Sequence, residues 1–219
     1  MDRKYDLIIF DWDGTLVDSQ AHIIHCMSRA IADERLPVPA GDDIRHIIGL
    51  SLPRAISSLL TDIGDPQVQR IADHYRRHFF DPAHEGSKLF PGAKQIVEQL
   101  HADGYYLAVA TGKGRRGLDM ALTSMQLASY FHITRCADET CSKPDPQMLQ
   151  EILTDLDLSS ERAIMIGDTS YDIEMANNIR MDSIAVTYGM HDPEHLQASA
   201  PTYFVDDLQQ LHSLLKRNM

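Results

Sequence analysis

Short runs of apolar residues, each ending at polar residues, recur along the chain. Five of them lie at 5–10, 106–110, 132–136, 163–166 and 183–187. They lack the alternation of a half-exposed strand, so they predict strands buried on both faces, as in a parallel sheet. A helical period fills the stretches 91–102, 115–125 and 146–156 between them. Strands that alternate with helices in this way predict a doubly wound α/β fold with right-handed crossovers.

The stretch from 17 to 87 breaks this alternation, because no strand pattern is evident in it. Its apolar spacing instead predicts helices at 20–34, 42–48, 52–63 and 66–79. Asp65 is placed to cap the last of these, and Pro66 suits its first turn. These helices indicate an inserted α-helical bundle that leaves the end of the first strand. Such an insert lies over the edge of the sheet where open α/β folds bind ligands.

The expected domain organisation follows from this insert. We expect a core domain with a doubly wound parallel sheet, made of residues 1–16 and 88–219. An α-helical cap domain would occupy residues 17–87. The two crossings between them would be hinges at 14–18 and 81–87.

Composition and charge limit the classes of partner. The chain has 219 residues, of which 43% are hydrophobic, so it can bury a sizeable core. Its formal net charge of −12 argues against nucleic acid as a partner. No apolar run approaches the ~18 residues of a membrane span. The three cysteines, Cys26, Cys136 and Cys141, lack the spacing of a disulfide framework or a metal site. We expect a cytoplasmic protein, a monomer or weak homodimer, without a membrane partner.

Polar residues that can carry chemistry follow the predicted strands in four clusters. These clusters are Asp11–Trp12–Asp13–Gly14–Thr15, Thr111–Gly112–Lys113, Lys143–Pro144–Asp145 and the residues from Gly167 to Asp172. The strands of a parallel sheet all end at one edge, so the clusters should meet there.

Four aspartates in these clusters, Asp11, Asp13, Asp168 and Asp172, predict a metal. At ~4 Å and an effective dielectric constant near ~20, each pair of carboxylates repels by ~4 kcal/mol. Hard oxygen ligands without a nearby histidine or cysteine cluster favour Mg²⁺. We expect Asp11, Asp13 and Asp168 to hold it, with Asp172 in a supporting role that orients a metal-bound water or Lys143.

The same clusters suggest phosphoryl transfer. A carboxylate can attack phosphorus, and Asp11 ends its strand at the expected edge. Asp13 could protonate the leaving oxygen and then activate the hydrolytic water. Thr111 and Lys143 would hold the phosphoryl oxygens, where the positive charge of Lys143 offsets developing negative charge. Gly112 would let the backbone approach the phosphate closely.

The four clusters, in this order and after these strands, resemble the motifs of the haloacid dehalogenase superfamily. The resemblance covers the whole chain and includes the helical insert after the first motif. It implies an aspartyl-phosphate on Asp11, and the presence of Asp13 is similar to the phosphatases and phosphomutases of that superfamily. The sequence Asp13–Ser19 followed by a helical cap resembles phosphoglycolate-phosphatase-like enzymes, which act on small phosphorylated molecules.

The resemblance also implies which further residues contact the substrate. Gly14, Thr15, Gly112 and Lys113 lie within or beside the motifs that bind phosphate. Arg45, followed by Gly49, resembles a substrate-contacting motif of the cap.

Other functions stay open at the level of sequence. A β-phosphoglucomutase-like enzyme also has both aspartates, but its mutases use a cap histidine twelve residues after the nucleophile, where this chain has Ile23 beside His22. An inorganic pyrophosphatase is a second enzymatic reading. A signalling protein phosphorylated on aspartate, or a binding protein without catalysis, is the non-enzymatic alternative. The helical insert favours turnover over signalling, since a lid excludes water.

Overall fold

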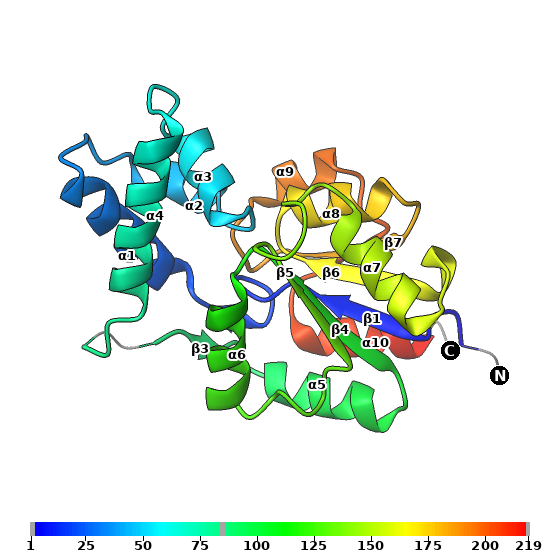
Figure 1. Ribbon diagram of the computed structural model, residues 1–219. Coiled ribbons are helices and arrows are strands. Elements are labelled where there is room, and N and C mark those ends of the chain that lie inside the picture. The colour runs from blue at the N-terminus through cyan, green and yellow to red at the C-terminus, as the bar shows by residue number, and fades with distance from the viewer. Residues whose placement is uncertain (1–2, 84–85, 218–219) are drawn as a thin grey trace.

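A parallel six-stranded sheet forms the centre of the core. The computed structural model describes residues 3–83 and 86–217 of the chain. In it the strands lie in the order β5-β4-β1-β6-β7-β8 (Figure 1). Their bounds are β1 Leu7–Phe10, β4 Tyr106–Thr111, β5 Ile133–Cys136, β6 Ala163–Gly167, β7 Asp182–Val186 and β8 Tyr203–Val205. Every residue of β1 and β6 is buried, which explains their unbroken apolar runs. The predicted doubly wound α/β class is confirmed.

Helices cover both faces of the sheet, and successive strand residues point to opposite faces. Ile8 and Phe10 pack against α5 (Ala93–Ala102), α6 (Arg115–Ser124) and α10 (Leu208–Arg217). Leu7 and Ile9 pack on the other face against α7 (Gln147–Leu156) and α8 (Ser170–Asn177). The short helices η1 (Ser160–Arg162) and α9 (Pro193–Ala198) complete the core. Figure 1 shows α7 and α8 on one side of the strands and α5 and α10 on the other.

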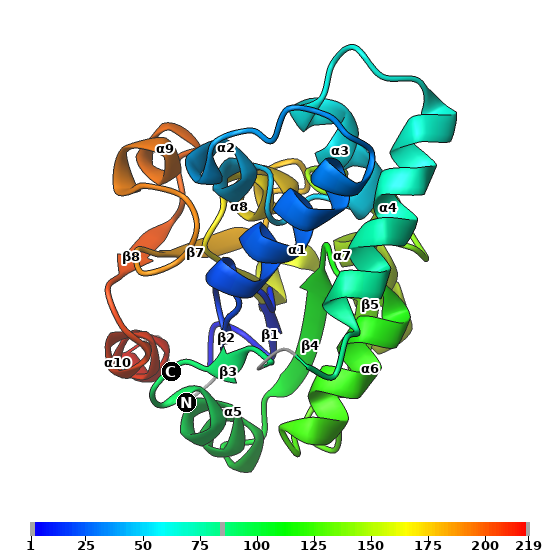
Figure 2. The same cartoon turned by 90° about the vertical axis from the view of Figure 1, so that its left-hand side faces the viewer.

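Among the described residues four helices lie between β2 and β3, in the segment that the sequence predicts as a cap. They are α1 Gln20–Asp33, α2 Gly41–His46, α3 Leu52–Leu59 and α4 Asp65–Phe79. They share an apolar core of their own that includes Met27, Ile56 and Ile71. The cap lies beyond the ends of β1 and β4, as the two views show (Figure 1, Figure 2).

The structure corrects several details of the sequence analysis. The stretch 17–87 does contain a strand, because β2 (Val17–Asp18) pairs antiparallel with β3 (Lys88–Leu89) where the chain enters and leaves the cap. Asp65 is the first residue of α4, and Gly64 stands at the capping position instead. β8 was not predicted from the sequence. Within the described ranges no helix combines the length and the apolarity needed to cross a bilayer.

Candidate active site

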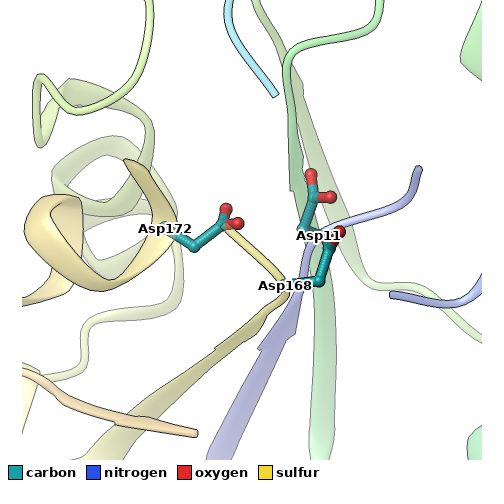
Figure 3. Close-up of side chains that lie close together, drawn as sticks. All are labelled: Asp11, Asp168 and Asp172. Atoms are coloured by element: carbon teal, nitrogen blue, oxygen red, sulfur yellow. The ribbon is translucent and has the colours of Figure 1, made fainter. Parts of the chain in front are cut away.

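The strand ends around β1 bring the predicted clusters together. Asp11 follows β1, Asp168 follows β6 and Thr111 ends β4, the two neighbours of β1 in the sheet. Asp172 reaches the same place from the first turn of α8. Figure 3 shows Asp11 and Asp168 side by side, with the carboxylate of Asp172 turned toward them. β1 is the point where the strand order reverses, which is where open α/β sheets bind ligands.

A buried lysine links two of these carboxylates. The Nζ of Lys143 lies 2.5 Å from Oδ1 of Asp11 and 2.6 Å from Oδ1 of Asp172, and its side chain is fully buried. Burial opposes the charge of this lysine, but the two carboxylates raise its pKa. Burial also raises the pKa of Asp11 to about 7, although Lys143 acts in the opposite direction. The second oxygen of Asp11, Oδ2, is buried and has no hydrogen-bond partner among the described residues.

Asp168 is held by hydrogen bonds to both of its oxygens. The hydroxyl of Thr15 donates to Oδ1 at 2.8 Å, and the backbone N–H of Met190 donates to Oδ2 at 2.7 Å. Burial, together with the charges of Asp11 and Asp172, raises the pKa of Asp168 well above its usual value. Two glycines make room for it. A Cβ on Gly14 would lie 2.0 Å from Oδ2 of Asp168, and one on Gly189 would lie 2.2 Å from its Cβ.

Gly189 is a functional position that the sequence analysis missed. It lies in the loop after β7, away from every motif that we considered. We expect Gly189→Ala to lower activity by about 100-fold or more, because the added methyl group must displace the Asp168 side chain. Phosphate release by the purified variant measures this effect. Gly86→Ala is the matched control, since an added Cβ there meets no atom within 4 Å. Wild-type activity in Gly189→Ala would show that Asp168 tolerates displacement.

Asp172 is fixed by the start of α8. Its Oδ2 accepts hydrogen bonds from the backbone N–H of Thr169 at 3.1 Å and from the Thr169 hydroxyl at 2.7 Å. Thr169 and Asp172 form a capping box, which satisfies N–H groups at the first turn of the helix. The same carboxylate therefore caps a helix and pairs with Lys143.

Among the described residues, the carboxylates of Asp11, Asp168 and Asp172 each offer an oxygen within 4.8 Å of the others, close enough to share one cation. The sequence predicts Asp13 as a third ligand and Asp172 in a supporting role, and in the structure the Asp172 carboxylate is the one that lies next to Asp11 and Asp168. Asp13 turns its Oδ2 to Lys113, whose Nζ lies 2.9 Å away. Its Oδ1 is buried without a hydrogen-bond partner in the described part of the chain.

The cap meets the site at Gly112. A Cβ on Gly112 would lie 2.4 Å from the carbonyl oxygen of Gly49, which is a backbone atom of the cap. Beside it, the hydroxyl oxygen of Thr111 accepts a hydrogen bond from the backbone N–H of Lys113 at 3.2 Å. The backbone N–H of Ser51 in the cap donates to the hydroxyl of Ser142 in the core at 2.8 Å. The glycine thus permits the close approach of cap and core.

Arg45 does not reach this place. Its guanidinium pairs with Asp192 in the core at 3.3 Å and with Asp42 at 3.6 Å. The described lining of the cavity includes Gly49 but not Arg45. In this conformation Arg45 ties the cap to the core beside the cavity, and its contact with substrate stays a prediction.

A cavity of about 440 Å³ lies between the cap and the core. Its floor is formed by core residues, namely Asp11, Asp13, Thr111, Gly112 and Lys113. Its roof comes from α1, α4 and the loop between α2 and α3. The volume is within the range of small-molecule sites, about 300–1,000 Å³.

Comparisons with known proteins show which family this chain resembles in sequence and fold. The family model described as "Haloacid dehalogenase-like hydrolase" matches residues 8–186. The chain is 34% identical to the "Probable phosphatase IndB" of Dickeya dadantii, with 96% of this chain and 95% of that protein covered. It is 30% identical to the "Phosphoglycolate phosphatase" of Vibrio cholerae, over 94% and 95%. A crystal structure of a predicted phosphatase from Clostridium acetobutylicum superposes with a TM-score of 0.88 at 26% identity, covering 97% of this chain and 99% of that one.

Proposed function

Because the chain belongs to the haloacid dehalogenase-like hydrolases and its relatives are phosphatases, we propose that it hydrolyses a small phosphomonoester through an aspartyl-phosphate on Asp11, with Mg²⁺ as cofactor. Its relatives are named as phosphatases, and this similarity identifies the chain as a phosphatase. The intermediate, the metal ion and the substrate are our proposal.

One observation carries the proposal. Asp11 lines the cavity, and its Oδ2 is buried without a hydrogen-bond partner among the described residues. Lys143 holds the other oxygen at 2.5 Å and so fixes the direction of the carboxylate. A fixed and unpaired carboxylate oxygen at the floor of a cavity is suited to attack phosphorus.

The proposed reaction has two steps. In the first, Oδ2 of Asp11 bonds to phosphorus while the bond from phosphorus to the ester oxygen breaks, and the leaving oxygen takes a proton from Asp13. In the second, a water molecule gives its proton back to Asp13 and attacks the phosphorus, which releases phosphate and restores Asp11. One carboxyl group acts first as acid and then as base. Lys113, 2.9 Å from Asp13, would hold that carboxyl in place.

Other groups would hold the phosphoryl oxygens. Thr111, Gly112 and Lys113 border the floor of the cavity, where a hydroxyl, backbone N–H groups and a cation are available. Gly14 and Thr15 are not among the described lining residues, and their contacts are with Asp168, for which Gly14 leaves room and to which the Thr15 hydroxyl donates. Lys143 contributes positive charge next to the nucleophile.

The acidic cluster fits a divalent cation. Burial raises the pKa of Asp11 and of Asp168, and the neighbouring carboxylates raise both further. Three carboxylates lie close together here with only Lys143 among the described residues to offset their charge, so a cation would stabilise their ionised forms. Asp11 and Asp168 would hold the ion, with Asp172 close to it, and their all-oxygen donor set is typical of Mg²⁺. When bound, such an ion offsets the charge of the phosphate and polarises its oxygens.

Removal of the metal should abolish activity, and the effect of the metal on stability should depend on pH. A raised pKa means that Asp11 keeps a proton below about pH 7, which a cation must displace. We therefore expect EDTA to stop phosphate release and Mg²⁺ to restore it. We also expect the rise in Tm on adding Mg²⁺ to be larger at pH 8 than at pH 5. At a hundredfold excess over Kd the ion adds about 2.7 kcal/mol to the free energy of unfolding.

The control for this experiment is Asp168→Asn, in which the rise in Tm should shrink at both pH values. A metal-dependent rise in Tm that is equal at pH 5 and pH 8 would contradict protonation of the cluster. Activity that is indifferent to EDTA would contradict the metal site itself.

A panel of phosphate esters tests the proposed reaction as a whole. Two relatives suggest probes by their printed names, the "Phosphoglycolate phosphatase" of Vibrio cholerae and the "Pyrophosphatase PpaX" of Bacillus cereus, 30% and 27% identical to this chain. Mg²⁺-dependent release of phosphate from at least one ester is expected. Transfer to a hexose phosphate in place of water would identify a mutase, which the apolar side chain of Ile23 in the cavity wall disfavours.

The location and assembly of the protein also remain proposals. Cys26, Cys136 and Cys141 are free thiols, which suits the reducing cytoplasm. A monomer or weak homodimer stays a prediction.

A further inference from the structure

The roof of the cavity, formed by the cap residues of its lining, is mostly apolar, with Ser51, Tyr75 and Arg76 as its polar side chains. It contains Ile23 and Met27 from α1, Ile48 and Leu50 from the loop between α2 and α3, and Tyr75 and Phe79 from α4. Ile23, Met27, Ile48 and Leu50 are all buried, with 1% to 7% of their surface exposed. A hydrophilic group of a ligand would bind poorly under these side chains, because it would lose its hydrogen bonds to water and find none to replace them.

Two of the three cations among the described lining residues have carboxylate partners. Lys113 pairs with Asp13 at 2.9 Å, and Arg76 pairs with Asp73 at 2.7 Å. Arg116 is exposed at the rim, where its guanidinium lies 4.5 Å from the centre of the Phe80 ring. Among the described lining residues these cations lie at the floor and at the exposed rim of the cavity, so the apolar side chains of the roof itself offer a carboxylate no partner.

Tyr75 brings a hydroxyl group to the roof. Burial raises the pKa of the Tyr75 hydroxyl well above its usual value, and the nearby Asp13 adds to this effect. The Tyr75 ring stacks on Phe79, with the ring centres 5.6 Å apart and an angle of 24° between the planes. Tyr75 lines the cavity, so its hydroxyl could form a hydrogen bond with a ligand there.

We propose that the substrate is a phosphate monoester whose organic part is a largely apolar ring, seated under this roof while the phosphate lies against Asp11. The inference rests on the proposed phosphatase function and narrows its substrate class. A ring can fill the apolar space, and a single polar substituent can bond to Tyr75. Phosphoglycolate is a poorer match, because its carboxylate would face Ile23, Ile48 and Leu50.

Three esters of simple alcohols test this preference in the wild-type protein with Mg²⁺. Benzyl phosphate carries a ring, ethyl phosphate lacks it, and 2-phosphoglycolate replaces it with a carboxylate. All three have alkyl leaving groups, so differences in rate report mainly on the organic part. We expect kcat/KM for benzyl phosphate to exceed both others by about 10-fold to 100-fold, from burial of the ring.

Two variants of the roof link the preference to its side chains. In Phe79→Ala and in Ile48→Thr, the ratio of kcat/KM for benzyl phosphate to that for ethyl phosphate should fall by about 5-fold or more. Phe204→Ala is the matched control, because Phe204 is 36% exposed on β8, outside the cavity lining. Its ratio should stay at the wild-type value.

A binding measurement gives a readout without turnover. In Asp11→Asn the esters should stay intact, so calorimetry can compare their affinities directly. Benzyl phosphate should bind more tightly than 2-phosphoglycolate, and with a more negative heat-capacity change, because apolar surface is buried.

The outcomes separate the two proposals. Efficient hydrolysis of 2-phosphoglycolate with weak hydrolysis of benzyl phosphate would overturn the ring-bearing substrate and leave the phosphatase function intact. A ratio that is the same in wild type and both roof variants would also overturn it. Absence of phosphate release from every ester would refute the proposed function, and the inference with it.

Discussion

Asparagine in place of Asp11 is expected to abolish phosphate release while the fold is kept. The amide is nearly the same size as the carboxylate, but its oxygen is a poor nucleophile and forms no acyl phosphate. We expect kcat to fall by a factor on the order of 10⁴ or more, as for other enzymes that lose a covalent nucleophile. Release of phosphate in a single-turnover assay measures the chemical step directly.

A control substitution and a phosphorylation test serve as checks on this variant. Asp62→Asn, an exposed position of the cap, is the matched control and should leave kcat unchanged. Wild-type protein quenched in acid during turnover should carry phosphate on Asp11, whereas Asp11→Asn should carry none. Retained turnover in Asp11→Asn would contradict the assignment of Asp11 as the nucleophile.

Loss of the Lys143 charge is expected to have the largest effect on stability. In Lys143→Met the carboxylates of Asp11 and Asp172 stay buried without their cation. Breaking a buried ion pair from one side costs about 3–5 kcal/mol. For a chain of this size that corresponds to a fall in Tm on the order of 10 °C. The variant should also lose activity, since the positive charge beside the nucleophile is gone. Thermal unfolding with and without Mg²⁺ measures the loss of stability, and phosphate release measures the loss of activity.

Two further proteins make this result interpretable. Lys216→Met removes an exposed lysine and should leave Tm within about 1 °C. The double variant Lys143→Met with Asp172→Asn removes one of the two buried carboxylates that lack a cation. It should recover part of the lost stability without recovering activity. If Lys143→Met melts at the wild-type temperature, the buried pair does not stabilise the fold.

The sequence predicted those parts of the fold in which local pattern and global packing agree. The runs around Ile8, Ala108 and Ile164 are apolar because both faces of these strands are covered. Once a parallel sheet is expected, strand ends share an edge, so the meeting of Asp11 with Asp168 follows from topology. The signal for the site therefore came from the order of motifs along the chain.

The remainder depends on contacts that no local pattern records. β2 and β3 have two residues each and form by pairing across the cap, where Val17 pairs with Leu89, 72 positions away, and Asp18 with Lys88, 70 positions away. β8 mixes exposed and buried residues at the edge of the sheet, so its apolar signal is weak. The role of Gly189 comes from Asp168 lying against it in space. The direction of Asp13 toward Lys113, and of Arg45 toward Asp192, is decided by side-chain pairing after folding.

The close approach of Gly112 to Gly49 also limits the space between the cap and the core. Gly112 faces a main-chain oxygen, which no rotamer change can move aside. A side chain at this position would act as a spacer between the two parts of the molecule. The absence of a side chain at Gly112 thus sets how closely the cap approaches the core, and with it the size of substrate that fits between them.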